Sequence, residues 1–201
     1  MKAGRFRGRQ LALFAMLALV GACSGHDRPP STVVDACRMQ SERPHWFRAM
    51  KRTEARWGVP VSVQLATIAR ESSFRHDARP TSRVGSWIFA RDVPRSSAYG
   101  YAQAIDGTWD SYLRDTGRRR AARDDFADSS DFIGWYMHTN SRVNGVPLHD
   151  AYNQYLAYHE GRTGFANGSY RAKTWLPPVA RDVEAWAVIY DQQLRTCPVR
   201  G

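Results

Sequence analysis

Glu71 is the residue whose position best suits acid–base chemistry. It follows the apolar run of residues 63–70, Val-Gln-Leu-Ala-Thr-Ile-Ala-Arg, whose pattern is that of a buried helix. A carboxylic acid at the end of such a helix is partly desolvated, and desolvation raises its pKa. A raised pKa keeps the acid protonated near neutral pH, which a general acid needs in order to protonate a glycosidic oxygen. The alternative is a surface glutamate that forms a salt bridge with Arg70 or Arg75, and position alone favours this alternative.

Other catalytic chemistries find little support in the chain. His138, His149 and His159 lack the close spacing of zinc ligands, so no metal site is expected. There is no glycine-rich phosphate-binding loop, and no Ser–His–Asp arrangement can be argued from spacing. We therefore expect chemistry that uses neither a metal nor a cofactor.

Helices are the elements expected to position Glu71. Apolar residues recur at helical spacing, while Gly58 and Pro60 mark the end of one helix and the start of the next. The expected helices cover residues 44–57, 60–72, 106–117, 126–143, 148–159 and 178–194. Asp106 is the expected N-cap of the third. Because strand signals are weak, the fold class expected for residues 37–201 is mostly α, with little or no β-sheet.

Residues 75–98 interrupt the helical pattern. Prolines, a glycine and several serines and arginines predict a long loop or a small β-like excursion. Trp87, Phe89, Tyr99 and Tyr101 lie on or beside this segment. Sugar rings have apolar faces that stack on aromatic side chains, so these residues could shape a glycan groove. They could equally pack the loop onto the domain.

Residues 1–22 have the pattern of a lipoprotein signal peptide. Four basic residues precede the apolar run Leu11–Val20, which is too short to span a membrane as a helix. The run ends in Val-Gly-Ala-Cys, which resembles a lipobox whose Cys23 becomes the lipidated first residue. An ordinary secretory signal with an incidental cysteine is the alternative. We expect residues 23–36 to form a lipidated tether. Because Ser24, and not aspartate, follows the cysteine, the expected address is the outer membrane facing the periplasm.

Two further cysteines, Cys37 and Cys197, lie near the two ends of the mature domain. An oxidising compartment would let them pair. A bridge that closes so long a loop could contribute about 4–5 kcal/mol in the chain-entropy model. Two free thiols are the alternative.

The charge of the chain bears on its partners. The formal net charge of +10 falls to +6 once the four basic residues of the expected signal are removed. A moderately basic protein suits an anionic polymer such as peptidoglycan, a nucleic acid or an anionic membrane surface, and a basic surface without a specific role is equally compatible. Export argues against nucleic acid.

Three short segments match, in order along the chain, the motifs of one enzyme family. They are residues 71–74 (Glu-Ser-Ser-Phe), residues 98–108 (Ala-Tyr-Gly-Tyr-Ala-Gln-Ala-Ile-Asp-Gly-Thr) and residues 157–161 (Ala-Tyr-His-Glu-Gly). Together they resemble the Glu-Ser, Gly-Leu-Met-Gln-Ile-Met-Pro-Gly-Thr and Ala-Tyr-Asn-Ala-Gly motifs of SLT-type lytic transglycosylases, which share the goose-type lysozyme fold. The matching positions are Glu71, Ser72, Gly100, Gln103, Gly107, Thr108, Ala157, Tyr158 and Gly161. The departures include Tyr101, Ala102, Asp106, His159 and Glu160.

The resemblance implies roles for the matched positions. Glu71 would be the single catalytic acid and then the base. Gln103 would hydrogen-bond the sugar or its N-acetyl group, and Tyr158 would orient Glu71 or the substrate. Alternatively, Gln103 could cap the following helix and Tyr158 could be a core ring. Further candidates for substrate contacts are Ser72, Tyr99, Tyr101 and Glu160.

Glu160 stands where the family usually has a small apolar residue. A second carboxylate opposite Glu71 would allow two-carboxylate hydrolysis. The favoured alternative is a structural salt bridge with Arg162 or Arg75.

By this resemblance, the chain is expected to be a lysozyme-like peptidoglycan lytic transglycosylase. It would cleave the bond between N-acetylmuramic acid and N-acetylglucosamine and leave a 1,6-anhydro product. A hydrolytic muramidase, with water activated by Glu160 or Asp106, is one alternative, and a non-catalytic peptidoglycan-binding lipoprotein is another. The expected partners are glycan strands, the membrane through a lipid on Cys23, and other cell-wall enzymes or a secretion machine.

Overall fold

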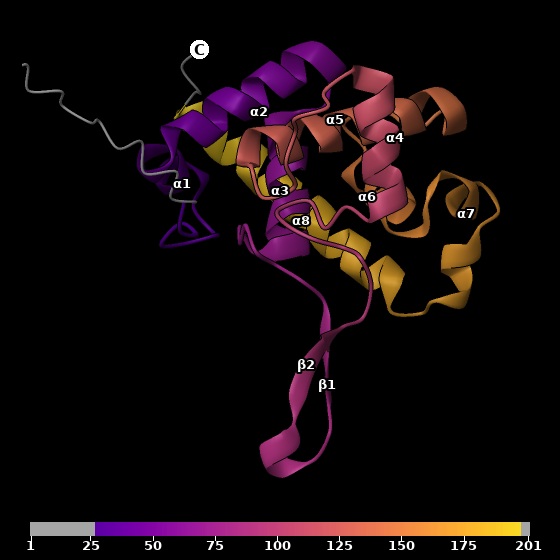
Figure 1. Ribbon diagram of the computed structural model, residues 1–201. Coiled ribbons are helices and arrows are strands. Elements are labelled where there is room, and N and C mark those ends of the chain that lie inside the picture. Colours follow the sequence, from indigo (N-terminus) through magenta and orange to yellow (C-terminus); the bar gives the residue numbers. More distant parts are fainter. Residues whose placement is uncertain (1–26, 198–201) are drawn as a thin grey trace, which may run out of the picture.

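The computed structural model describes residues 27–197 as a body of packed helices with one projecting β-hairpin (Figure 1). The α-helices of this part are α1 (Ala36–Glu42), α2 (Pro44–Trp57), α3 (Val61–Ser72), α4 (Asp106–Thr116), α5 (Phe126–Asn144), α6 (Ala151–Glu160), α7 (Arg162–Ala166) and α8 (Leu176–Thr196). Two strands, β1 (Thr81–Val84) and β2 (Arg91–Pro94), and two 3₁₀ turns, η1 (Trp87–Phe89) and η2 (Ser169–Ala172), complete it. The predicted mostly α-helical fold class is confirmed.

Local signals account for many of the helix ends. α2 begins at Pro44, whose fixed φ suits a first turn, and it ends at Gly58, which adopts a left-handed φ of 78°. The side chain of Asp150 accepts a hydrogen bond from a backbone N–H in the first turn of α6. The prediction for α4 is wrong in one detail. Asp106 is its first helical residue, and the N-cap is Ile105, which has no side-chain acceptor to offer.

The core forms around α3. This helix packs against α8, while α2 packs against α5. Every residue from Val61 to Ile68 is buried, including the polar Gln64. The Gln64 amide group donates to two backbone carbonyls and accepts from the hydroxyl of Ser130, so its burial leaves no polar atom without a partner. α3 is therefore a firmly held helix, and Glu71 lies in its last turn.

A disulfide between Cys37 and Cys197 joins α1 to the end of α8, with the two Cα atoms 5.7 Å apart. The predicted pairing is confirmed. Gln193 of α8 strengthens the same junction, because its side chain accepts a hydrogen bond from the Ala36 N–H and donates one to the Val34 carbonyl. The beginning and the end of the described chain are thereby held together.

The segment before α1 also contacts the body. Residues 27–35 belong to the expected tether, yet Asp27 accepts a hydrogen bond from the indole N–H of Trp46 at 2.9 Å. The expected signal peptide and Cys23 lie outside the described residues. Within the described part, no helix has the length and apolarity needed to cross a bilayer.

The segment predicted as a long loop or a β-like excursion is a β-hairpin. Its two strands are antiparallel, with Thr81 opposite Pro94 and Val84 opposite Arg91. The strands are exposed to solvent along nearly their whole length. Figure 1 shows the hairpin extending away from the helical body, so its far end contacts no helix.

Candidate active site

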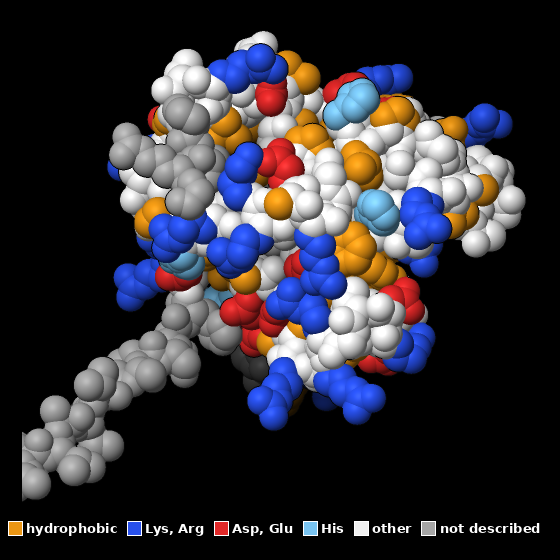
Figure 2. Space-filling view, turned by 90° about the horizontal axis from the view of Figure 1, so that it is seen from above, with side chains coloured by type: hydrophobic (Ala, Val, Ile, Leu, Met, Phe, Trp, Pro, Cys, Tyr) orange, Lys and Arg blue, Asp and Glu red, His pale blue; other side chains and the backbone are white. Residues whose placement is uncertain are grey.

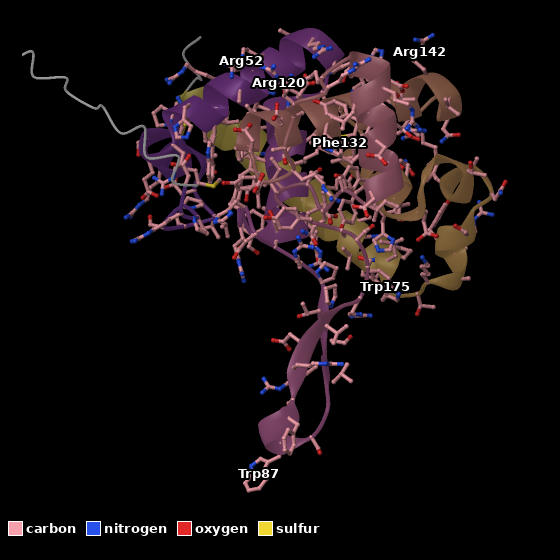
Figure 3. All side chains as sticks on the ribbon, viewed as in Figure 1. Arg52, Trp87, Arg120, Phe132, Arg142 and Trp175 are labelled. Carbon is pink, nitrogen blue, oxygen red and sulfur yellow. A yellow bond between two sulfur atoms is a disulfide. The ribbon has the colours of Figure 1, made fainter. Side chains whose placement is uncertain are left out.

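A pocket of about 430 Å³ opens where the last turns of α3 and α6 meet α4 and α5. The residues that line it come from segments far apart in the sequence. They include Glu71, Pro80 at the root of the hairpin, Gln103, Thr108, Phe132, Tyr136 and Tyr158. Phe132 lies within the helical body (Figure 3) and contributes to the pocket lining. The fold thus assembles one half-enclosed cavity around one acidic side chain from α3.

Glu71 is half-buried at the wall of this pocket. Burial raises the pKa of Glu71 to about 7, although a hydrogen bond from the Tyr155 hydroxyl and the positive charge of Arg70 oppose the increase. A substantial fraction of the carboxyl group is therefore protonated at neutral pH. This is the protonation state that a general acid requires.

Two tyrosines of α6 flank the Glu71 carboxyl group. Tyr155 hydrogen-bonds the carboxylate directly. Tyr158, three residues later and on the same helix face, lines the pocket and donates a hydrogen bond to the Ala102 carbonyl at 2.5 Å. Burial and the nearby Glu71 charge raise the pKa of Tyr158 well above its usual value, so its hydroxyl stays an uncharged donor. The sequence motifs do not indicate Tyr155, although its spacing from Tyr158 is a signal that could have identified it.

Gln103 shapes the turn that precedes α4. Its side-chain Nε2 donates to the carbonyl oxygens of Ala78 and Gly100, both at 2.8 Å, which leaves Oε1 as the acceptor at the pocket wall. It does not cap α4. At Gly100, φ is 76°, and a Cβ atom would lie 1.9 Å from the carbonyl oxygen of Arg123. Only glycine fits there, which explains this position of the motif.

The sequence was also compared with known proteins. A family model described as the transglycosylase SLT domain matches residues 11–197. The chain belongs to this family. No match is found among curated proteins. Membership supports lytic transglycosylase activity in general and a lysozyme-like fold, and it implies binding of peptidoglycan glycan strands.

Glu160 is the second carboxylate at the pocket of this SLT domain, and both of its oxygens accept hydrogen bonds from neighbouring side chains. One oxygen accepts hydrogen bonds from Lys173 at 2.7 Å and His159 at 3.1 Å, and the other accepts one from Ser169 at 2.6 Å. Burial alone would raise the pKa of Glu160, but these hydrogen bonds lower it to about 2. The salt bridge favoured from the sequence is formed by Lys173 and by neither of the two arginines considered. In the described part of the chain, no group of three or more acidic, histidine or cysteine side chains could hold a metal ion.

Tyr101 is a core residue in this SLT domain, and its expected contact with substrate is wrong. Its side chain is 1% exposed. The ring meets those of Trp46 and Phe126 edge-on, with centroids 5.6 Å and 5.2 Å apart. The physical reason is the aromatic cluster between α2 and α5, which buries the ring where the Gly100 turn packs against it.

Ser72 and Tyr99, the two other substrate candidates, also lie away from the pocket lining. The hydroxyl of Ser72 is buried and donates to the Ile68 carbonyl one turn earlier in α3, at 3.2 Å. The ring of Tyr99 lies under the guanidinium of Arg79, 4.1 Å from its centroid, and its hydroxyl donates to Asp124 at 3.4 Å. Tyr99 therefore packs the root of the hairpin onto the body.

Trp175, just before α8, is an aromatic residue at the pocket edge that the motifs do not indicate. Its side chain is 52% exposed, and its ring meets that of His159, a pocket-lining residue, edge-on at 5.0 Å between centroids. Figure 3 shows it on the side of the body from which the hairpin leaves. A sugar ring bound beyond Glu71 could stack there. Nothing in the sequence distinguishes this tryptophan from the buried ones, because its exposure depends on the path between α7 and α8.

Proposed function

We propose that this protein is a peptidoglycan lytic transglycosylase in which Glu71 is the sole general acid and base. The observation that carries the proposal is a protonatable carboxyl group, with a pKa of about 7, at the wall of a pocket bounded by tyrosines. Glu71 protonates the oxygen that joins N-acetylmuramic acid to N-acetylglucosamine. The bond from that oxygen to the anomeric carbon breaks, and N-acetylglucosamine leaves with the proton.

The second half of the reaction returns the enzyme to its starting state. The N-acetyl carbonyl of the muramoyl sugar stabilises the electron-poor anomeric carbon, and the C6 hydroxyl of the same sugar then attacks it. Glu71, now a carboxylate, takes the proton of that hydroxyl. The product is a 1,6-anhydro ring. One carboxylate is enough because the nucleophile belongs to the substrate. The free Oε1 of Gln103 suits the N–H of the N-acetyl group.

A hydrolytic muramidase is the nearest alternative, and it needs a second carboxylate to activate water. Glu160 is a poor base for this purpose, because both of its oxygens accept hydrogen bonds and its pKa is lowered to about 2. Asp106 is 64% exposed and pairs with Arg123 at 2.8 Å. These contacts favour the transglycosylase.

Mass spectrometry of digested peptidoglycan sacculi tests the proposal. We expect muropeptides with 1,6-anhydromuramoyl ends, each one water lighter than the hydrolysis product. Reducing muramic acid ends as the main product would establish the muramidase instead. Binding without any released fragment would establish the non-catalytic alternative.

We also propose that the protein is an exported lipoprotein of the outer membrane, facing the periplasm and lipidated on Cys23. Two observations support export: the substrate of its family lies outside the cytoplasm, and the disulfide suits an oxidising compartment. Labelling of cells with a radioactive fatty acid, followed by membrane fractionation, tests the lipidation and the location in the outer membrane. A protein that stays unlabelled and soluble would contradict it.

The hydrogen bond from Tyr155 to Glu71 leads to a prediction for the pH profile. The acid form of Glu71 is lost as pH rises through about 7, so kcat should fall on that side of the profile. Tyr155 holds the pKa of Glu71 down, so Tyr155→Phe should raise this pKa and move the alkaline fall of kcat to higher pH. Tyr152→Phe on the same helix is the matched control and should leave the profile in place. An unmoved profile in Tyr155→Phe would show that the hydroxyl does not act on Glu71.

A further inference from the structure

The tip of the β1–β2 hairpin carries the most exposed apolar side chains of the described chain. Trp87 is 90% exposed and Phe89 is 78% exposed, and Val84 beside them is 49% exposed. Figure 3 shows Trp87 at the far end of the hairpin, directed away from the helical body. The hairpin adds nothing to the hydrophobic core, because its strands are exposed. An exposed apolar end of this kind is typical of a surface that binds a partner molecule.

The tip is a formed turn that presents these side chains. The Phe89 N–H donates to the Ser86 carbonyl at 3.1 Å, and the Ala90 N–H donates to the Trp87 carbonyl at 3.3 Å. Gly85 has a φ of 99°, and a Cβ atom there would lie 2.7 Å from the carbonyl oxygen of Phe89. The turn thus depends on glycine, and it holds the two aromatic residues at the end of the arm.

The charges of the hairpin are almost all positive. Residues 79–95 contain four arginines and one acidic residue, Asp92, while the seven residues between Arg83 and Arg91 carry no charge. The register places Arg83 opposite Asp92 and Arg91 opposite Val84, so arginines lie on both faces of the hairpin. Among the described residues, no carboxylate forms an ion pair with Arg83, Arg91 or Arg95.

The face of the helical body that is turned away from the hairpin differs from the hairpin. Figure 2 views the body from the side turned away from the hairpin, where basic side chains are scattered among acidic and uncharged ones. The hairpin combines an uncharged aromatic tip with flanking arginines that form no ion pair with a carboxylate of the described residues. This is the arrangement expected of a segment that enters a membrane interface. Tryptophan settles at the level of the lipid head groups, and arginines are attracted by anionic lipid.

We propose that the hairpin tip inserts into the interface of a bilayer that contains anionic phospholipid. A glycan strand is a less suitable partner, because a protein binds sugars through several polar groups positioned to hydrogen-bond the sugar hydroxyls. Besides the indole N–H of Trp87, the hydroxyl of Ser86 is the sole polar side-chain group between Arg83 and Arg91. The tip is also far from the pocket. Since each strand residue spans about 3.3 Å, the tip lies about 20 Å from Pro80, the residue at the root of the hairpin that lines the pocket. This proposal does not rest on the transglycosylase reaction.

Quenching of Trp87 fluorescence by brominated phospholipid tests the insertion. The full-length chain is mixed with phosphatidylcholine vesicles that do or do not contain phosphatidylglycerol, with bromine on the acyl chains. The emission of Trp87 is obtained by subtracting that of Trp87→Phe. We expect this emission to shift to shorter wavelength and to be quenched on the anionic vesicles, and we expect Glu71→Gln to behave like the wild type. Trp175→Phe should keep the quenched component, because Trp175 lies on the body.

A matched pair of charge variants tests the role of the arginines. In Arg83→Gln/Arg91→Gln, the vesicle concentration needed for half-maximal quenching should rise about fivefold for each arginine removed. The control Arg52→Gln/Arg142→Gln removes the same charge from the body, away from the hairpin, and should change little. Equal effects of both pairs would overturn the assigned role of the hairpin arginines.

Three other results would overturn the proposal. The first is Trp87 emission that does not respond to anionic vesicles. The second is an equal response to neutral vesicles, which would show that insertion does not require anionic lipid. The third is a response to purified, lipid-free peptidoglycan sacculi in place of vesicles, which would make the hairpin a glycan-binding arm.

Discussion

Replacement of Glu71 by glutamine is expected to lower the rate of glycan cleavage by about 10²–10⁴-fold, the usual contribution of a positioned general acid or base. The amide has nearly the same shape as the carboxyl group, and its oxygen can still accept the hydrogen bond from Tyr155. The substitution therefore removes the titrating proton while it preserves the pocket. Release of anhydromuropeptides from sacculi measures the rate, and pelleting with sacculi measures binding.

The expected combination is lost cleavage with retained binding and an unchanged circular dichroism spectrum. Glu184→Gln, on the exposed face of α8, is the matched control and should cleave at the wild-type rate. Glu160→Gln separates the two enzyme hypotheses, because a muramidase that uses Glu160 as its base would lose activity to a similar degree. If Glu71→Gln cleaves as fast as the wild type, Glu71 is neither acid nor base, and the proposed mechanism fails.

Loss of the disulfide should have the largest effect on stability. Cys37 and Cys197 are 160 residues apart, and closing such a loop lowers the entropy of the unfolded chain. The double variant Cys37→Ser/Cys197→Ser should therefore have a free energy of unfolding that is about 5 kcal/mol lower in the chain-entropy model. This is a large part of the total for a domain, which is typically about 5–15 kcal/mol. Urea unfolding followed by tryptophan fluorescence measures the difference.

Reduction of the wild-type protein supplies the control. With dithiothreitol present, its unfolding midpoint should fall to that of the double variant, because both then lack the same constraint. No residue named in the pocket lining belongs to α1, and we expect the double variant to keep its kcat at temperatures well below its unfolding transition. A difference in unfolding free energy below about 1 kcal/mol would show that the junction at Gln193 suffices without the covalent bond.

Most of the helices could be predicted because their signals are local. The start of α2 at Pro44 and its end at Gly58 depend on φ preferences within a single turn. The expected ends of α3 and α5 lie close to those observed. α1 and α7 could not be predicted, because both are short and the surrounding body stabilises them.

Tyr101 and Tyr158 show what the sequence motifs could not predict. Tyr101 and Tyr158 both lie in matched motifs, and both were candidates for contact with substrate. Tyr101 is buried between α2 and α5, whereas Tyr158 lines the pocket. The difference comes from partners such as Trp46, which lies 55 residues from Tyr101 and is brought near it by packing alone.

The sequence by itself determined the helical class, the family, and the position of one glutamate at the end of a buried helix. These features follow from short-range backbone preferences, from the pattern of apolar residues and from three ordered motifs. The tertiary structure alone decided the surroundings of that glutamate, with Tyr155 against its carboxyl group and Lys173 on the neighbouring Glu160. It also decided that residues 81–94 form a projecting hairpin whose tip exposes two aromatic side chains. Such surroundings depend on segments that are distant in sequence, and their burial and charge exist only once the chain has packed.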